Sequence, residues 1–503
     1  MRTKMAILLA AGSAAAADTV PPRFQKMETP GHVYDGGWEH FVGGGVAVFD
    51  CNDDDRPEMF VAGGSSPAQL FINTSDTEVR FLQDNPGHLS LTRVTGAYPV
   101  DIDGDGFLDL AVLRVGKDLL LRGKPNCAFE PFTALSFQSQ DHWTTGFSAT
   151  WERGQTLPTL AFGTYVDRSN PNGPFEACGP TLLYQPQGEK YGDPVRLEPG
   201  HCSLSILFSD WARTGRADLR VSNDRHYYVR GGQEQLWAME DTPRLYSEAD
   251  GWLPYSIWGM GIASRDLTGD GFSDVYLTSM GDQKFQVFDP APDGPTWRDA
   301  TYDRGTTAHR PHAGGDGRPS TGWHAQFGDV NNDGLDDIFV AKGNVEQMPD
   351  AAQNDPNNLL MQTFTGQFVE TASEAGVASM AKSRGGALAD FNGDGWLDLV
   401  VVNRGSDLEV FQNEPTTGNW LMIDLGQSHP NRQAVGSFIE VKTPEGIQTR
   451  EVTIGGGHAS GIAGFHHFGL GDLETAEVRV IWPDGEHGDW QKVDANQVIR
   501  LSR

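Results

Sequence analysis

Acidic loops recur along the chain, and the spacing of their side chains could bind a cation. The clearest copy reads DIDGDGFLD from Asp101 to Asp109. In a tight loop, alternate side chains can converge on one point, so positions 1, 3, 5 and 9 supply oxygens and the carbonyl of position 7 adds another. Gly106 permits the positive φ that such a turn needs. Several carboxylates without His or Cys favour Ca²⁺ over Mg²⁺ or Zn²⁺.

Five copies of this loop keep the pattern, so we expect about five calcium sites. In chain order the predicted side-chain ligands are Asp50, Asn52, Asp54 and Glu58; Asp101, Asp103, Asp105 and Asp109; Asp266, Thr268, Asp270 and Asp274; Asp329, Asn331, Asp333 and Asp337; and Asp390, Asn392, Asp394 and Asp398. The predicted carbonyl ligands are Arg56, Phe107, Phe272, Leu335 and Trp396. A sixth copy keeps only Asp210 and Asp218, and a seventh, in residues 150–165, has lost the acidic pattern.

An EF-hand and an acidic turn without an ion are the two alternatives for these loops. An EF-hand also carries Asp at positions 1, 3 and 5, but it needs a Glu at position 12 and flanking helices. Position 12 is apolar in all five copies: Val61, Val112, Leu277, Val340 and Val401. The second alternative is a set of acidic turns without an ion, since Asp, Asn and Gly are common turn residues.

Short apolar runs flank each loop and define the elements that would position it. Runs such as LAVLRVG and LVVVNRG have the length and composition of strands, and 61 glycines and 29 prolines in 503 residues favour many turns. With the two degenerate copies the repeat occurs seven times, at a spacing of roughly 50 to 60 residues that is typical of a four-stranded propeller blade. The sequence therefore predicts an all-β fold, a seven-bladed β-propeller over residues 18–413. A linear solenoid, the alternative, normally needs capping units.

The chain after the repeats lacks the acidic loops and has a different sequence pattern. A Pro-Thr-Thr-Gly stretch at residues 415–418 indicates a junction. Beyond it, alternating segments predict strands at residues 420–425, 437–443, 448–454, 477–483 and 497–501. Residues 419–503 should thus form a small C-terminal β-module.

At this point a family resemblance becomes specific. The acidic loops with their apolar strands resemble FG-GAP/VCBS repeats, as in the integrin α-chain propeller. The C-terminal residues resemble an ASPIC/UnbV domain; the residues that carry the likeness are Asn431-Arg432, Val435-Gly436, Gly455 to Ser460, His467 to Gly471 and Trp482 to Gly485. Together they resemble the cartilage acidic protein family. The resemblance implies a calcium-bound propeller with an extracellular role in interaction or adhesion and no established reaction.

Charge and the N-terminus limit the location and the partners. The net charge of −30 argues against nucleic acid and against anionic membrane surfaces. Residues 1–17 have a basic start, a short apolar stretch and an Ala-rich end, which predicts a signal peptide cleaved near Ala17 and a secreted or periplasmic protein without a membrane span.

Four cysteines in an exported chain allow two disulfides in three connectivities. We favour Cys178 with Cys202, because one loop or hairpin separates them; Cys51 would then pair with Cys127.

Candidate residues for chemistry other than calcium binding are few. Histidines at 309, 312 and 324 and at 458, 466 and 467 could form a metal or catalytic site, although packing roles suffice for them. Arg384 and Arg404 lie on either side of the last acidic loop in sequence, where salt bridges are the simpler explanation and ligand contact the alternative.

These observations favour a binding, adhesion or scaffolding protein whose partner is an extracellular or periplasmic protein or glycan. The long segments 166–202 and 283–323 would form its recognition surface. An enzyme acting on polysaccharides as a hydrolase or lyase, with a site on the propeller face, is the first alternative, and a periplasmic assembly factor is the second.

Overall fold

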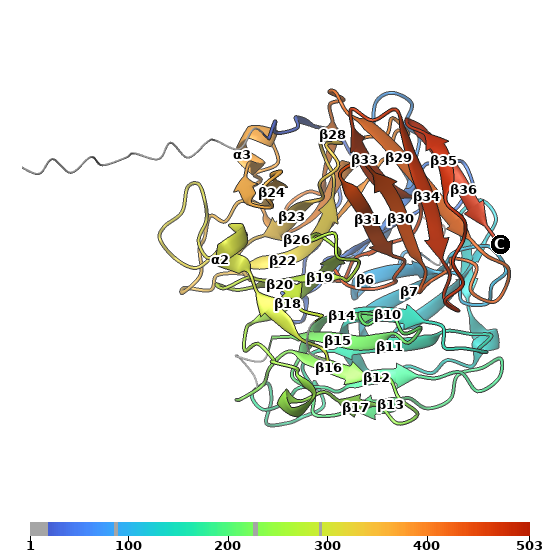
Figure 1. The fold of residues 1–503 in the computed structure, drawn as a ribbon. Helices are drawn as coiled ribbons and strands as arrows, with labels where there is room; N and C mark the ends of the chain where they lie inside the picture. The colour runs from blue at the N-terminus through green and yellow to red at the C-terminus, as the bar shows by residue number, and fades with distance from the viewer. Residues whose placement is uncertain (1–18, 85–88, 225–229, 291–293) are drawn as a thin grey trace, which may run out of the picture.

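The computed structural model describes residues 19–84, 89–224, 230–290 and 294–503. The predicted signal peptide lies outside this range. The described chain is almost entirely β-structure (Figure 1), with two single-turn α-helices, α2 (Thr301–Arg304) and α3 (Ala372–Ala375), and the 3₁₀ turns η1 (Trp38–His40), η2 (Thr133–Leu135) and η3 (Glu248–Asp250). None of the helices in this part of the chain has the length and hydropathy of a membrane span.

Residues up to 413 form antiparallel sheets of four strands each. The first four sheets contain β2 (Val46–Phe49), β3 (Glu58–Val61), β4 (Gln69–Asn73) and β5 (Phe81–Asp84); β6 (Val94–Val100), β7 (Asp109–Gly116), β8 (Leu119–Lys124) and β9 (Ala128–Pro131); β10 (His142–Thr150), β11 (Thr159–Thr164), β12 (Thr181–Tyr184) and β13 (Val195–Leu197); and β14 (Ser203–Ser209), β15 (Asp218–Asn223), β16 (Gln235–Ala238) and β17 (Arg244–Leu245). A short pairing between β7 and β10 joins the second and third of these sheets.

The remaining sheets of this region follow the same plan. They contain β18 (Gly259–Arg265), β19 (Asp274–Ser279), β20 (Lys284–Phe288) and β21 (Trp297–Asp299); β22 (Gly322–Gly328), β23 (Asp337–Lys342), β24 (Asn358–Gln362) and β25 (Phe368–Glu370); and β26 (Lys382–Ala389), β27 (Asp398–Arg404) and β28 (Glu409–Asn413), completed by the N-terminal strand β1 (Phe24–Lys26). Segments 166–202 and 283–323, which we expected to be long recognition loops, contain outer strands of two sheets, because each repeat needs four strands to complete its sheet.

The first strands of these sheets form a closed circle. β2, β6, β10, β14, β18, β22 and β26 are neighbours in that order, and β26 is also the neighbour of β2. Both faces of these strands are buried, so they read as continuous apolar or small-residue runs. The fold is therefore all-β and β-propeller-like.

Residues 419–503 form the C-terminal module, which lies against the circle as the orange-to-red strands of Figure 1. One of its sheets contains β29 (Asn419–Gly426), β33 (His466–Gly471) and β36 (Gln497–Ser502); the other contains β30 (Phe438–Thr443), β31 (Gly446–Glu451), β34 (Thr475–Ile481) and β35 (Gln491–Asp494). The alternation in sequence located β29, β30, β31, β34 and β36 but missed β33 and β35. A shared apolar cluster joins the module to the circle through Tyr98, Phe147 and Ile454.

One segment of the module, residues 454–462, enters the centre of the circle; we call it the axial segment. It bridges the first strands of several sheets: Ile454 with Ala149, Gly455 with Leu207, Gly457 with Ile262, and Ser460 with Ala97. Its last two residues, β32 (Gly461–Ile462), pair in parallel with β2. The axial segment thus gives backbone hydrogen bonds to strands that are far apart in sequence.

His458 is the largest side chain of the axial segment, and all its polar groups are satisfied. Its Nε2 accepts the N–H of Gly43 at 3.1 Å, its Nδ1 lies 3.0 Å from the carbonyl oxygen of Met260, and its backbone N–H donates to Nδ1 of His324. Burial lowers the pKa of His458 to about 3, so the ring is neutral. These contacts make His458 a structural residue of the axis.

Glycines on the first strands leave the space that the axial segment occupies. A Cβ added to Gly45 would lie 1.7 Å from the carbonyl oxygen of Ala459, and one added to Gly96 would lie 2.0 Å from it. Any larger residue at these positions must displace the backbone of the axial segment.

We expect Gly96→Ala to lower the free energy of unfolding by about 1–3 kcal/mol, as overpacking of a filled site does. Gly37→Ala is the matched control, because Gly37 is exposed, has a φ of −75° and would place its Cβ in open space. Urea denaturation of the two variants measures the difference. Equal stability of Gly96→Ala and the unaltered protein would contradict the packing described here.

Candidate metal centres

Each acidic loop occupies the same place in its sheet. It connects the first strand to the second, and its ninth residue is the first residue of that second strand. This ninth residue pairs with the last residue of the first strand, as in Val100 with Asp109 and Ala389 with Asp398. The repeat read from sequence is therefore in register with the strands.

The carboxylate at position 1 organises its own loop. Asp101 accepts the backbone N–H groups of Asp105 and Gly106 at 3.1 and 3.0 Å. Asp105, at position 5, accepts the N–H of Phe107 at 3.0 Å. In the other four predicted loops the N–H of position 6 likewise donates to position 1, and the N–H of position 7 donates to position 5, so their backbones fold alike.

The carboxylate at position 9 fixes the loop to the sheet. In Asp109 one oxygen accepts the N–H of Ile102, inside the loop, and the other accepts the N–H of Gly123, on the neighbouring strand, both at 2.8 Å. Asp274, Asp337 and Asp398 each make the equivalent pair of bonds. All four side chains are completely buried, so position 9 combines a structural role with any role as a ligand.

Burial of these carboxylates is electrostatically unfavourable in the absence of a cation. Burial, with neighbouring carboxylates adding to it, raises the pKa of Asp101 to about 6 and that of Asp390 to about 7, although backbone hydrogen bonds oppose the shift. The pKa values of Asp109, Asp337 and Asp398 are raised well above the usual range for the same reason. A bound cation would remove this cost.

The donor atoms are the oxygens that a hard cation prefers, and among the described residues one of the five loops brings three predicted carboxylates together. In the loop at residues 101–109, oxygens of Asp101, Asp103 and Asp109 all lie within 4.8 Å of one another. In the loop at residues 266–274, the buried hydroxyl of Thr268 has no hydrogen-bond partner within the part of the chain that the structure describes. Oxygen-only clusters of this kind are the ligands that Ca²⁺ prefers.

An arginine from a neighbouring strand contacts the second acidic loop, and the sequence of the loop alone does not indicate it. The guanidinium of Arg122, on β8, lies 2.6 Å from Asp103 and 2.9 Å from Asp105. The guanidinium neutralises part of the negative charge of these carboxylates, so Arg122 would compete with a cation at this loop.

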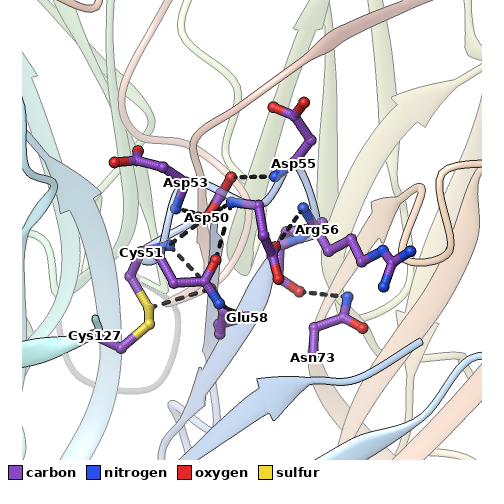
Figure 2. The surroundings of a disulfide bond; sticks show 11 residues. Asp50, Cys51, Asp53, Asp55, Arg56, Glu58, Asn73 and Cys127 are labelled. Carbon is purple, nitrogen blue, oxygen red and sulfur yellow. Dashed lines mark hydrogen bonds between the residues drawn. A yellow bond between two sulfur atoms is a disulfide. The ribbon is translucent and has the colours of Figure 1, made fainter. Parts of the chain in front are cut away.

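The first loop is crosslinked to the second sheet (Figure 2). Cys51, at position 2, forms a disulfide with Cys127, and Cys178 pairs with Cys202. Glu58 accepts the N–H of Cys51 at 2.9 Å, and burial raises its pKa to about 8. The paired sulfurs are not available to a metal, so the predicted donors at this loop remain the oxygens of Asp50, Asn52, Asp54 and Glu58.

The degenerate loop at residues 210–218 keeps two carboxylates, and both accept hydrogen bonds from the protein. Asp210 still accepts the N–H groups of Thr214 and Gly215. Asp218, however, accepts hydrogen bonds from Trp211 and Tyr246 and forms an ion pair with Arg216. Protein donors thus satisfy the carboxylates that remain.

The C-terminal module contacts every loop that begins with Asp, which places these loops on one face of the circle. The contacts, one for each loop, are Arg500 with Asp55, Arg432 with the carbonyl of Gly104, Glu451 with the N–H of Asp210, Thr449 with Asp266, Arg450 with Asp336, and His467 with the carbonyl of Gly395. The module therefore covers the face that carries the candidate metal centres.

The histidines outside the axial segment do not form one site. His309 pairs with Asp282, whereas His312 contacts Glu370 and Asn358. His467 lies against an acidic loop through a backbone carbonyl. These three histidines therefore have separate local partners.

Arg384 and Arg404 lie at the far end of β26 and β27 from the last acidic loop, so they do not contact its carboxylates. The pairing brings Arg404 opposite Lys382. Arg404 forms an ion pair with Glu346, whereas Arg384 donates to backbone carbonyls and stacks 4.0 Å from the Trp323 ring centroid. The two residues are adjacent to the loop only in sequence, because a strand separates them from it.

Two protein families match parts of this chain. The FG-GAP-like repeat family matches residues 50–112 and 329–401, and the ASPIC and UnbV family matches residues 427–503. The chain therefore contains FG-GAP-like repeats and an ASPIC/UnbV domain, which confirms the resemblance seen in sequence.

The most informative relatives are cartilage acidic protein 1 of Mus musculus and of Homo sapiens. Each is 34% identical to this chain over 110 residues, which is 21% of this chain. The matched segment spans only 17% and 16% of those proteins.

Solved structures resemble the chain more distantly. BBS1N in its complex with ARL6DN gives a TM-score of 0.45 at 11% identity, covering 79% of this chain and 99% of that one. The WD40 domain of Toxoplasma gondii coronin gives 0.42 at 12% identity, covering 80% and 89%. The strand pairings described above, rather than these scores, define the arrangement of the sheets.

Two substitutions in one loop should separate structural from ligand roles. Asp398→Asn places an amide N–H₂ against a backbone N–H, so we expect a loss of about 1–3 kcal/mol of unfolding free energy both with and without Ca²⁺. Asp394→Asn keeps an acceptor for Trp396 and disturbs only the hydrogen bond from the Asn392 side chain, so it should lower stability much more with Ca²⁺ than without it. Thermal denaturation in Ca²⁺ and in EDTA measures both. Identical profiles for the two variants would refute the distinction.

The pH dependence of the metal-free protein provides a second check. Because burial raises the folded pKa of Asp101, Asp266 and Asp390 to about 6 to 7, above the usual value of 3.8, the folded state binds more protons than the unfolded state between about pH 4 and pH 7. The melting temperature in EDTA should therefore fall as the pH rises through this window. Saturating Ca²⁺ should abolish the fall; an equal slope with Ca²⁺ would exclude these groups as ligands.

Proposed function

We propose that this protein is a secreted or periplasmic calcium-binding β-propeller that binds an extracellular protein or glycan and does not catalyse a reaction. In this proposal residues 1–17 are a signal peptide, residues 18–413 form seven blades, and residues 419–503 are the ASPIC/UnbV domain. The observation that carries the proposal is the repeated set of buried carboxylates at one end of the first strands. A cation at each set would stabilise both its blade and the module that covers it.

Further support comes from the chain's own composition and relatives. A net charge of −30 makes tight packing of acidic loops costly without counter-ions. The relatives are named cartilage acidic protein 1, and because cartilage is a tissue rich in extracellular matrix, we extend an extracellular location to this chain. The face opposite the module remains available for a partner.

Metal analysis and thermal denaturation test the proposal directly. We expect about five calcium ions for each chain, and extracellular modules typically bind with dissociation constants of about 10⁻⁴ to 10⁻³ M. Each occupied site should add about 2.7 kcal/mol of unfolding free energy at a hundredfold excess over its dissociation constant. EDTA should therefore lower the melting temperature markedly, and Ca²⁺ should restore it better than Mg²⁺.

The binding role has its own experiment. The protein is immobilised and exposed to the native extracellular fraction with Ca²⁺ or with EDTA, and Asp394→Asn serves as a loop-specific comparison. We expect a defined partner to be retained in Ca²⁺ and released in EDTA. A protein that contains no calcium and melts identically in chelator would disprove the metal assignment, and retention of no partner would disprove the binding role.

A further inference from the structure

A cavity of about 710 Å³ lies between the face of the circle and the C-terminal module. Small-molecule sites in proteins typically occupy about 300–1,000 Å³. The ends of β18 and β22 form its floor with Ile262, Arg265 and Gln326, and the module closes it with Arg450, Thr453 and His466. Arg432 and Gly464, at its edge, are exposed, so the cavity is connected to solvent.

The lining of this cavity reverses the charge balance of the whole chain. The chain has 38 Lys and Arg against 68 Asp and Glu, yet the cavity is lined by four arginines and three carboxylates. One of the four, Arg503, forms ion pairs with Asp484 and Glu486, which do not line the cavity. All three carboxylates are already occupied: Asp101 belongs to an acidic loop, Asp424 pairs with Arg500 at 3.3 Å, and Glu451 accepts hydrogen bonds from Ser209 and Asp210 at 2.6 Å. Because these three carboxylates already have partners, they would repel an anion in the cavity less than free carboxylates would.

Two of the arginines share a single counter-ion. Arg450 lies 3.0 Å and Arg265 lies 3.5 Å from different oxygens of Asp336. Two guanidinium groups and the one carboxylate that pairs with both leave a net positive charge on this trio. The three side chains are largely buried, and electrostatic interactions are stronger there than at the surface. Burial is costly enough to lower the pKa of Arg450 to about 9, even though Asp336 opposes the shift.

His466 adds a neutral group to the same cavity. Its side chain is only partly buried, and within the described ranges its ring has no hydrogen-bond partner. Burial, followed by the charges of Arg450 and Arg265, lowers its pKa to about 3. A neutral imidazole offers one N–H donor and one acceptor, the combination that a hydroxyl group matches.

We propose that the cavity binds a small hydroxylated carboxylate of the hexuronic acid class, with Arg265 and Arg450 holding the carboxylate and His466 contacting a hydroxyl. A planar guanidinium matches a carboxylate through paired hydrogen bonds. Thr453 and Gln427, which also line the cavity, offer further neutral partners for hydroxyl groups. This site does not depend on calcium at the acidic loops, although it lies beneath the same module.

Isothermal titration calorimetry of the full chain in Ca²⁺ tests the site, with D-glucuronate as the probe and D-glucose and acetate as comparisons. We expect glucuronate to bind more tightly than about 1 mM and both comparisons to bind at least about tenfold more weakly. If glucose bound as tightly as glucuronate, the arginines would not recognise the carboxylate, and the proposal would be wrong. If acetate bound as tightly, the hydroxyl groups would not be recognised, and the hexuronic acid class would be wrong. Absence of glucuronate binding up to about 10 mM would overturn the proposal.

Substitutions locate the binding in this cavity. Arg265→Met and His466→Gln should each weaken glucuronate binding by about tenfold, whereas Arg244→Met, which removes an exposed arginine on β17, should leave it unchanged. If Arg265→Met does not fold, Arg265→Lys keeps the charge but loses the paired geometry and should still weaken binding. Unaltered affinity in Arg265→Lys and His466→Gln would place the ligand elsewhere and overturn the proposal.

Discussion

The axial segment fills the centre of the circle and at two positions approaches the first strands so closely that only glycine fits there, and the rest of the architecture depends on this constraint. Gly45 and Gly96 lie directly against the carbonyl of Ala459, and Tyr98 donates its hydroxyl to the carbonyl of Gly456. The first strands therefore converge on a peptide chain instead of on a water-filled channel. Since that peptide belongs to the C-terminal module, the module cannot be separated from the circle without emptying its centre.

The same constraint explains why the module and the acidic loops are physically linked. The axial segment fixes the module over one end of the circle, and one polar contact with each Asp-containing loop follows from that position. Carboxylate oxygens at positions 1, 5 and 9 accept hydrogen bonds from backbone N–H groups. These bonds hold the loops in one conformation without an ion. Their raised pKa values measure the cost of holding that arrangement without a cation.

Local sequence predicted the parts of the structure that depend on short-range order. The nine-residue acidic pattern marked both the end of one strand and the start of the next, because position 9 is fixed to the neighbouring strand by its carboxylate. Alternation located five module strands. The family likeness, carried by motifs in the loops and in the tail, was confirmed by the family comparisons.

The parts that sequence missed are contacts between segments far apart in the chain. A run of three glycines before His458 has no periodicity, so nothing in it indicates a strand-like passage through the circle. Arg122 reaches the second loop from β8, and Arg450 reaches Asp336 from the module, which no spacing within a loop can show. Arg384 and Arg404 illustrate the converse, since residues adjacent to a loop in sequence lie a whole strand away from it in space.

The pairing of β1 with β28 has a consequence for how the molecule is made. During synthesis, the strand that emerges first must wait for nearly four hundred later residues before its partner exists, and the axial segment arrives later still. Formation of long-range pairs of this kind is slow, because loop-closure entropy must be overcome before the contacts form. The sheet that contains β1, and the contacts that the axial segment makes with the circle, can therefore form only late, after the chain through residue 462 has been made.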